Sequence, residues 1–132
     1  VNLGNTEISY SPNIIAGSAL KYLPVANLEL QVLNKYVGEQ FLSNIEAPLS
    51  RLDSYFTTDF NVQYTLKTKS LFKEIVLTGL VNNVFNTAYV NNGYFFTFDL
   101  PNDPDPGVTT FEGAGFYPQA KLNFLVGATL RF

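Results

Sequence analysis

In the segment 121–132, KLNFLVGATLRF, apolar residues alternate with small or polar residues, and this pattern indicates the fold class. Its apolar residues fall at every second position, in the order Leu122, Phe124, Val126, Ala128, Leu130 and Phe132. The residues between them are mostly small or polar. A period of two residues is typical of a β-strand with one apolar and one polar face. The segment therefore predicts a long strand that carries Phe132 on its apolar face.

Four other segments have the same period of two residues. They are 13–22, 27–41, 55–67 and 73–86. The clearest is 55–67, YFTTDFNVQYTLK, in which Phe60, Val62 and Tyr64 share one face. These segments are roughly twice as long as the usual strand of about 5 to 6 residues in globular proteins. The sequence therefore predicts an all-β protein with five long strands.

The connections between the expected strands alternate in length. Those at 23–27 and 67–72 are short, whereas those at 43–53 and 87–116 are longer. This alternation predicts consecutive antiparallel strands with short turns at one end and long loops at the other. Within the longest connection, the segment 99–107, DLPNDPDPG, predicts a loop without strand pairing because proline lacks the N–H that a ladder needs.

Composition excludes several classes of function. A net charge of −3 argues against a nucleic-acid partner, and the absence of Cys and His excludes disulfides, thiolate or imidazole metal sites and Ser-His-Asp chemistry. Asp59 and Glu74 are the nearest approach to a catalytic carboxylate pair, and nothing in the sequence sets their distance. Asp99, Asp103 and Asp105 do not have EF-hand spacing and are expected to be solvated loop acids. We predict no enzyme activity, no catalytic or metal-binding residue and no cofactor.

The strand pattern favours a transmembrane β-barrel. About ten residues tilted near 40° cross roughly 25 Å of hydrocarbon, and barrels carry aromatic girdles at both interfaces. Aromatic residues cluster near both expected ends of the strands: Tyr22, Tyr64, Phe72 and Phe132 at the short connections, and Phe41, Tyr55, Phe56, Phe85, Tyr89, Phe116 and Tyr117 at the long ones. The alternative is a soluble β-sandwich that binds a ligand such as a carbohydrate.

A spanning sheet has to close, because backbone groups cannot stay unpaired in lipid. Five strands are too few, since bacterial barrels begin at about eight. We therefore expect residues 1–132 to be the C-terminal part of a larger barrel, and the missing initial Met agrees with this expectation.

Five stretches carry a resemblance to a known family: YSPNIIAGSALKY, LNKYVGEQFL, LDSYFTTDFNVQYTL, LTGLVNNVFNTAYVNNGY and YPQAKLNFLVGATLRF. Together they resemble the C-terminal barrel region of TonB-dependent outer-membrane receptors, of the kind abundant in Bacteroidetes. The stretch VNNVFNTAY at 81–89 is similar to a recurrent pattern of the penultimate strand in that family. The alternating end with a final Phe is similar to the signal recognised by the barrel-assembly machinery.

The resemblance implies a 22-stranded barrel in the bacterial outer membrane, plugged by an N-terminal domain. Such receptors import ferric siderophores, haem, cobalamin or glycans, with energy from the TonB complex acting on an N-terminal box. Plug, box and earlier strands are absent from these 132 residues. The implied partners are outer-membrane lipid, the rest of the barrel with its plug, the TonB complex and the barrel-assembly machinery. The long connections would face outward.

Three groups of residues are candidates for function. The ligand-loop candidates are Tyr94, Phe95, Phe96, Phe98 and Asp99, since aromatic platforms suit sugars and aromatic chelators. The alternative for 94–98 is an extension of the hairpin in which alternate residues pack. The candidates that face the plug, expected near the rim of the short turns, are Glu29, Lys121 and Arg131, and the assembly-signal candidates are Phe124, Leu130 and Phe132.

Overall fold

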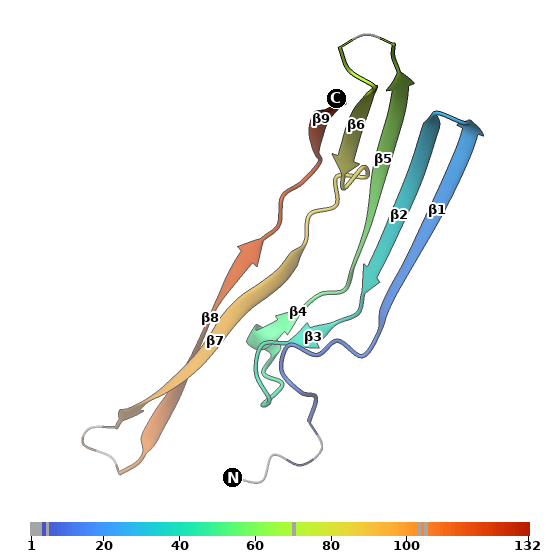
Figure 1. The fold of residues 1–132 in the computed structure, drawn as a ribbon. Coiled ribbons are helices and arrows are strands. Elements are labelled where there is room, and N and C mark those ends of the chain that lie inside the picture. Colours follow the sequence, from blue (N-terminus) through green and yellow to red (C-terminus); the bar gives the residue numbers. More distant parts are fainter. Residues whose placement is uncertain (1–3, 5, 70, 103, 105) are drawn as a thin grey trace. The chain divides into compact units, whose positions relative to one another are not determined.

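The computed structural model describes residues 4, 6–69, 71–102, 104 and 106–132, and these form an all-β protein with antiparallel sheets. In chain order the elements are β1 (Ile15–Val25), β2 (Leu28–Val37), β3 (Gln40–Phe41), the 3₁₀ helix η1 (Pro48–Ser50), β4 (Arg51–Leu52), β5 (Tyr55–Lys67), β6 (Glu74–Asn82), β7 (Val90–Pro101), β8 (Val108–Pro118) and β9 (Asn123–Arg131) (Figure 1). Within the described residues, no helix is both long and apolar enough to cross a bilayer.

The elements belong to two compact units. The sheet unit contains β1, β2, β5, β6 and β9, which lie side by side in that order (Figure 1). The hairpin unit contains β3, β4, η1 and the β7–β8 hairpin. The five strands predicted from the sequence are therefore present, and their order in the sheet follows their order in the chain. β1 and β9 are the two edges, so the sheet is open in the described part of the chain.

Several strand ends differ from the prediction, and β2 stops at Val37 rather than 41, because Gln40 and Phe41 pair with β4 instead. β6 stops at Asn82 rather than 86, because Asn83 has a φ of 52° and turns the chain out of the ladder. β1 continues to Val25 and leaves only Ala26 and Asn27 for the turn that was expected to span 23–27. Alternation alone does not show where a backbone leaves the extended conformation, so these boundaries shifted by a few residues.

In the hairpin unit, the longest connection is mostly strand. β7 pairs with β8 along their length, from Val90 opposite Pro118 to Pro101 opposite Val108, with one irregularity between Val90 and Asn92. The prediction that residues 99–107 form no ladder is wrong for 99–101, because Asp99, Leu100 and Pro101 pair with Thr110, Thr109 and Val108. Proline is tolerated there because it is the last residue of β7.

Buried apolar side chains are few among the described residues. Most of them lie in the hairpin unit around β3, η1 and β4: Val37, Leu42, Ala47 and Leu52. Leu42 also approaches β7, since a Cβ on Gly93 would lie 3.0 Å from a methyl carbon of Leu42 and 2.5 Å from the carbonyl oxygen of Gly115. In the sheet unit, the buried apolar residues are Tyr55 and Val76. Most apolar side chains of the sheet are therefore left on its surface.

Candidate functional site

One face of the sheet unit is almost entirely apolar. Residues that pair directly across an antiparallel ladder point to the same side. The register of β5, β6 and β9 therefore places four rows on one face: Phe60–Val81–Phe124, Val62–Gly79–Val126, Tyr64–Leu77–Ala128 and Leu66–Ile75–Leu130. We call this the apolar face. It contains the apolar residues that alternation predicted on one face of 55–67 and on one face of 121–132.

The apolar face continues across β2 and β1. The N–H of Thr65 donates to the carbonyl oxygen of Asn27 (2.8 Å), which brings Phe56 opposite Tyr36 in a regular antiparallel ladder. The hydroxyl of Thr58 donates to Oδ1 of Asn34 (2.7 Å), so even-numbered residues of both strands share this face. Nδ2 of Asn34 donates in turn to Oγ of Ser18 (3.1 Å), and this bond adds the even-numbered residues of β1. The apolar residues added in this way are Ala16, Leu20, Tyr22, Pro24, Leu28, Leu30, Val32, Tyr36 and Phe56.

No second layer covers this face at β9 within the described chain. Val126 is 81% exposed and Phe124 is 75% exposed, while Leu125 on the other side of the same strand is 61% exposed. Apolar surface of this extent on a sheet indicates a partner or an apolar medium, because monomeric soluble proteins bury such faces.

The opposite face, which we call the polar face, carries the charged residues of the sheet. Nζ of Lys21 lies 2.7 Å from Oε1 of Glu29, and Nη1 of Arg131 lies 2.6 Å from Oε2 of Glu74. Glu74 also pairs directly with Arg131 in the ladder. These exposed pairs each contribute little stability, in the range of about 0 to 1 kcal/mol. Glu29 lies near the start of β2 and Arg131 at the end of β9, so both are at the end of the sheet near the short turns, as predicted.

Lys121 does not lie with them, and its prediction as a contact at that rim is wrong. β9 begins at Asn123, which pairs with Asn82 at the far end of β6 from Glu74. Lys121 precedes β9, so it lies at the opposite end of the sheet from Arg131. In the described part of the chain its side chain makes no ion pair. Lys121 precedes β9 and Arg131 ends it, and a strand of 9 residues separates its two ends by roughly 30 Å.

Asp59 and Glu74 also lie apart. Glu74 pairs with Lys67, and Asp59 precedes Lys67 by eight residues on β5, which corresponds to roughly 26 Å. Each carboxylate has another role, since Oδ1 of Asp59 accepts the N–H of Asn83 (2.8 Å) and Glu74 pairs with Arg131. The two side chains therefore do not form a catalytic pair.

The VNNVFNTAY stretch contains a hydrogen-bonded turn centred on Asn83. Asn83 is 3% exposed, and its side-chain amide exchanges two hydrogen bonds with the backbone of Thr87, at 2.8 and 2.9 Å. Its Nδ2 also lies 3.4 Å from the carbonyl oxygen of Ala120. Asn86 has a φ of 56°, and its Oδ1 accepts the N–H of Leu122 (3.2 Å). Both residues therefore connect the end of β6 to the start of β9.

The left-handed backbone explains why asparagine occurs at these two positions. A positive φ is unfavourable for most L-residues, and asparagine is among the few that tolerate it. Its amide also supplies a donor and an acceptor to the neighbouring backbone. The motif stands out in the sequence through its resemblance to a family, and this structural role was not predicted. The pair of asparagines three residues apart was the available signal.

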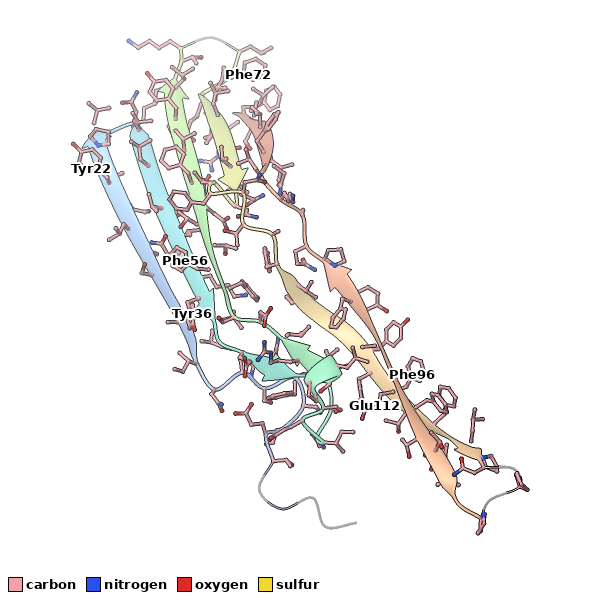
Figure 2. All side chains as sticks on the ribbon, turned by 180° about the vertical axis from the view of Figure 1, so that it is seen from behind. Tyr22, Tyr36, Phe56, Phe72, Phe96 and Glu112 are labelled. Carbon is pink, nitrogen blue, oxygen red and sulfur yellow. The ribbon has the colours of Figure 1, made fainter. Side chains whose placement is uncertain are left out.

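The assembly-signal candidates lie at the two ends of β9. Phe124 and Leu130 lie on the apolar face, opposite Val81 and Ile75 of β6. The ring of Phe132 lies 5.0 Å from that of Phe72, centroid to centroid, and Phe132 is 72% exposed. Figure 2 shows Phe72 and Tyr22 at the same end of the sheet unit, with Tyr36 and Phe56 toward its other end. Tyr55, which was expected in the second girdle, is buried and lies on the polar face because its position on β5 is odd-numbered.

The ligand-loop candidates divide between the two faces of the β7–β8 hairpin. Tyr94, Phe96 and Phe98 follow one another on one face, and their neighbouring rings are 6.3 Å apart and tilted by less than 20° (Figure 2 labels Phe96). Phe111 adds a fourth ring, 5.4 Å from Phe98. Phe95 and Asp99 lie on the other face, where the hydroxyl of Thr110 donates to Oδ1 of Asp99 (2.7 Å). The five candidates therefore do not form one platform.

Two glycines make room for this row of rings. Gly113 pairs with Phe96 and Gly115 pairs with Tyr94. A Cβ at either glycine would lie 2.4 Å from a ring carbon of its partner, so the rings lie directly over the glycine backbone. Such cross-strand covering of glycine is a known way to stabilise a β-ribbon. Tyr94, Phe96 and Phe98 nevertheless remain about half exposed, so the outer surface of the ring row is open to a ligand.

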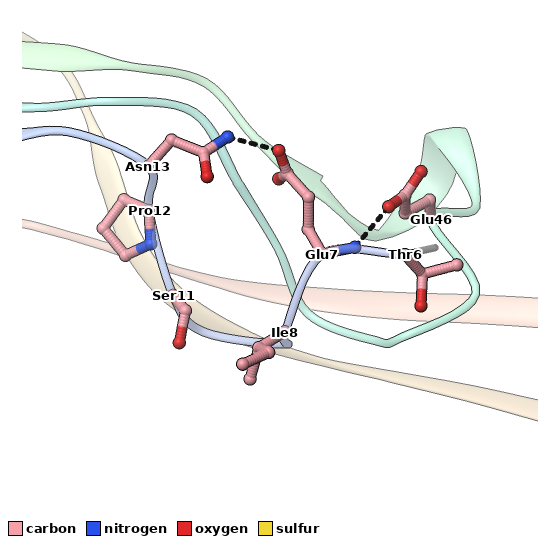
Figure 3. Close-up of a pocket in the computed structure, with 7 residues that line it drawn as sticks. All are labelled: Thr6, Glu7, Ile8, Ser11, Pro12, Asn13 and Glu46. Atoms are coloured by element: carbon pink, nitrogen blue, oxygen red, sulfur yellow. Dashed lines mark hydrogen bonds between the residues drawn. The ribbon is translucent and has the colours of Figure 1, made fainter. Parts of the chain in front are cut away.

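One hollow of the hairpin unit has a lining that is part polar and part apolar. Its lining includes Glu7, Asn13 and Glu46, as Figure 3 shows. Oε1 of Glu46 accepts the N–H of Glu7 (2.5 Å), and Oε1 of Glu7 accepts Nδ2 of Asn13. In the described ranges, no group of three or more acidic, His or Cys side chains is arranged to hold a metal ion. Asp103 and Asp105 lie outside the described residues.

No protein-family model matches the sequence, and neither the curated proteins nor the solved structures include a significant match.

Proposed function

We propose that this chain forms the C-terminal strands of the barrel of a TonB-dependent outer-membrane receptor. The receptor takes up a scarce nutrient of the ferric siderophore, haem, cobalamin or glycan class. In this proposal the apolar face contacts outer-membrane lipid, and the polar face lines the interior, where Glu29 and Arg131 lie near the plug. The connections that contain β3–β4 and β7–β8 are extracellular. The TonB complex acts through a region outside these 132 residues.

The observation that carries the proposal is the height of the apolar face. On β5 the apolar band between Thr58 and Thr68 runs from Phe60 to Leu66, and Phe56 lies beyond Thr58. Ten residues at about 3.3 Å each give roughly 33 Å of chain between the two threonines. At the tilt of about 40° found in transmembrane barrels, this corresponds to a height of roughly 25 Å, which is the height of the lipid-facing band of such barrels.

A soluble β-sandwich would need a second sheet over the apolar face. Cell fractionation and detergent dependence separate the two functions. We expect the intact protein in the outer-membrane fraction, with a mobility on gels that changes after heating. Recovery of the protein from cells as a monodisperse monomer without detergent would contradict the proposal and favour the sandwich.

The ring row on β7–β8 is the part of the receptor that we expect to contact the nutrient. Replacing both Tyr94 and Phe96 with Ala should weaken binding about tenfold or more, since each stacked ring contributes about 0.5 to 1.5 kcal/mol. The measurement is uptake of, and binding to, the nutrient whose import requires the receptor. Phe95→Ala is the matched control because it removes an aromatic ring from the opposite face. Equal affinities of the double variant and the wild type would leave the rings with a purely structural role.

Deleting Phe132 is expected to separate assembly in cells from folding. The ring of Phe132 packs on Phe72 but is 72% exposed, so its loss should cost only about 1 to 2 kcal/mol, below that of a fully buried Phe. Recognition by the assembly machinery would make the deletion much more harmful in cells. We expect outer-membrane abundance to fall sharply while refolding into detergent stays nearly normal. Wild-type abundance of the deletion variant would show that Phe132 acts only as an interfacial aromatic residue.

A further inference from the structure

The apolar face is interrupted by one row of polar side chains. The row consists of Ser18, Asn34 and Thr58, from β1, β2 and β5. Thr58 donates to Oδ1 of Asn34 (2.7 Å), and Nδ2 of Asn34 donates to Oγ of Ser18 (3.1 Å). The remaining residues of this face on the three strands are apolar or aromatic, so the polar row is a local feature and not a general weakening of the pattern.

The polar row has hydrogen-bonding capacity to spare. An asparagine amide has two N–H donors, and the hydroxyl of Ser18 is both donor and acceptor. Within the described residues the Asn34 side chain makes only the two bonds above, so one N–H and the proton of Ser18 remain available. A polar group without a partner in hydrocarbon is costly. The polar row therefore needs a polar partner from outside the sheet.

The surroundings of the polar row specify that partner as uncharged. The charged residues of β1, β2 and β5 are Lys21, Glu29, Lys35, Asp59 and Lys67, which all have odd numbers and lie on the polar face. No charge on the apolar face is therefore available to attract a phosphate. Beside the polar row is a small, open hollow whose walls include Tyr36 and Phe56 and whose lining is mostly apolar (Figure 2 labels both rings).

We propose that the polar row binds the carbonyl groups that link acyl chains to the head of an outer-leaflet lipid, and that the hollow holds the adjoining part of the chain. This inference rests on the membrane location proposed above. Thr58 marks the upper limit of the band of roughly 25 Å, which is the depth at which ester and amide carbonyls replace hydrocarbon. The interfacial rings of Tyr36 and Phe56 lie next to the polar row on the side away from the band.

Paired vesicles of ester-linked and ether-linked phosphatidylcholine test the proposal. The two lipids have the same headgroup and chains, and only the ester lipid has carbonyls. The intact receptor and its Asn34→Leu variant are unfolded with denaturant in both. Asn34→Leu loses its bonds to Ser18 and Thr58 in either lipid. The ratio of its effects on the unfolding equilibrium constant in the two lipids therefore gives the contribution of the lipid carbonyls alone. We expect the rise in the unfolding equilibrium constant to be about fivefold larger in the ester lipid.

Asn61→Leu is the matched control because Asn61 lies on the polar face of β5, where its effect should be equal in the two lipids. Equal effects of Asn34→Leu in the two lipids would overturn the inference, since phosphate and water are the same in both. The proposed function would still stand if the receptor inserted into both vesicles. Failure of the wild-type protein to associate with either vesicle would instead contradict the membrane location itself.

Discussion

Val126→Arg is expected to destabilise the intact receptor by about 2 to 4 kcal/mol, the range for arginine at the middle of the lipid-facing surface of a barrel. Val126 lies in the second of the four registered rows, opposite Gly79 on β6 and thus in line with Val62 on β5. The new guanidinium would have to enter hydrocarbon or distort the bilayer around it. The measurement is the free energy of unfolding of the receptor refolded into phospholipid vesicles.

Leu125→Arg is the control for this prediction. Leu125 neighbours Val126 on the same strand and is also well exposed, but it points to the polar face opposite Leu80. We expect its destabilisation to be at most about 1 kcal/mol, as for most exposed surface substitutions. Gly127 is unsuitable as a control because a Cβ there would lie 2.8 Å from Oγ1 of Thr78. Equal losses for Val126→Arg and Leu125→Arg would contradict the assignment of the two faces.

Asn83→Ala is expected to destabilise the protein by about 2 to 4 kcal/mol. Alanine in a left-handed conformation costs about 1 to 2 kcal/mol, and the two amide bonds to Thr87 contribute about 1 kcal/mol each. The loss would free the end of β6 and weaken its connection to Ala120, which precedes β9. The free energy of unfolding of the intact protein, measured in denaturant, gives the result.

Asn83→Gly separates the two parts of this prediction. Glycine adopts a positive φ without strain, so this variant should lose the amide bonds only and be less destabilised than Asn83→Ala. Amide hydrogen exchange would show the site of the effect, with faster exchange expected at the N–H groups of Thr87 and Asn86. If both variants unfolded like the wild type, the turn would contribute nothing to stability, and another role for the asparagine pair would be needed.

The amino-acid sequence predicted the all-β, antiparallel architecture, the five strands of the main sheet and the side on which most of their residues lie. These features are local, since successive side chains of a strand point to opposite faces whatever the strand pairs with. For this reason alternation placed Phe60, Val62 and Tyr64 on one face of their strand and Phe124, Val126 and Leu130 on one face of theirs, and the register shows that these faces are continuous. The alternation of short and long connections likewise predicted the order of the strands in the sheet.

The candidate ligand surface was predicted only in part. The sequence identified an aromatic cluster at 94–98, and alternation was available to separate Phe95 from Tyr94 and Phe96. As a loop, the segment predicts a single platform, whereas the alternative of an extended hairpin in which alternate residues pack agrees with the observed register. Gly113 and Gly115 lie far along the chain from these rings, so their role became visible only when the hairpin register set them opposite Phe96 and Tyr94.

Which residues meet across strands became visible only in the folded sheet. The tertiary structure brought Ser18, Asn34 and Thr58 into one hydrogen-bonded row, buried Asn83 against the start of β9 and put Lys121 at the opposite end of the sheet from Arg131. Each of these features depends on register, turn geometry or strand direction. Register is set by backbone pairing between segments distant in sequence, and the period of two residues is unchanged when a strand slides by two positions along its neighbour. Alternation therefore assigns a residue to a face, and cross-strand pairing assigns it a neighbour.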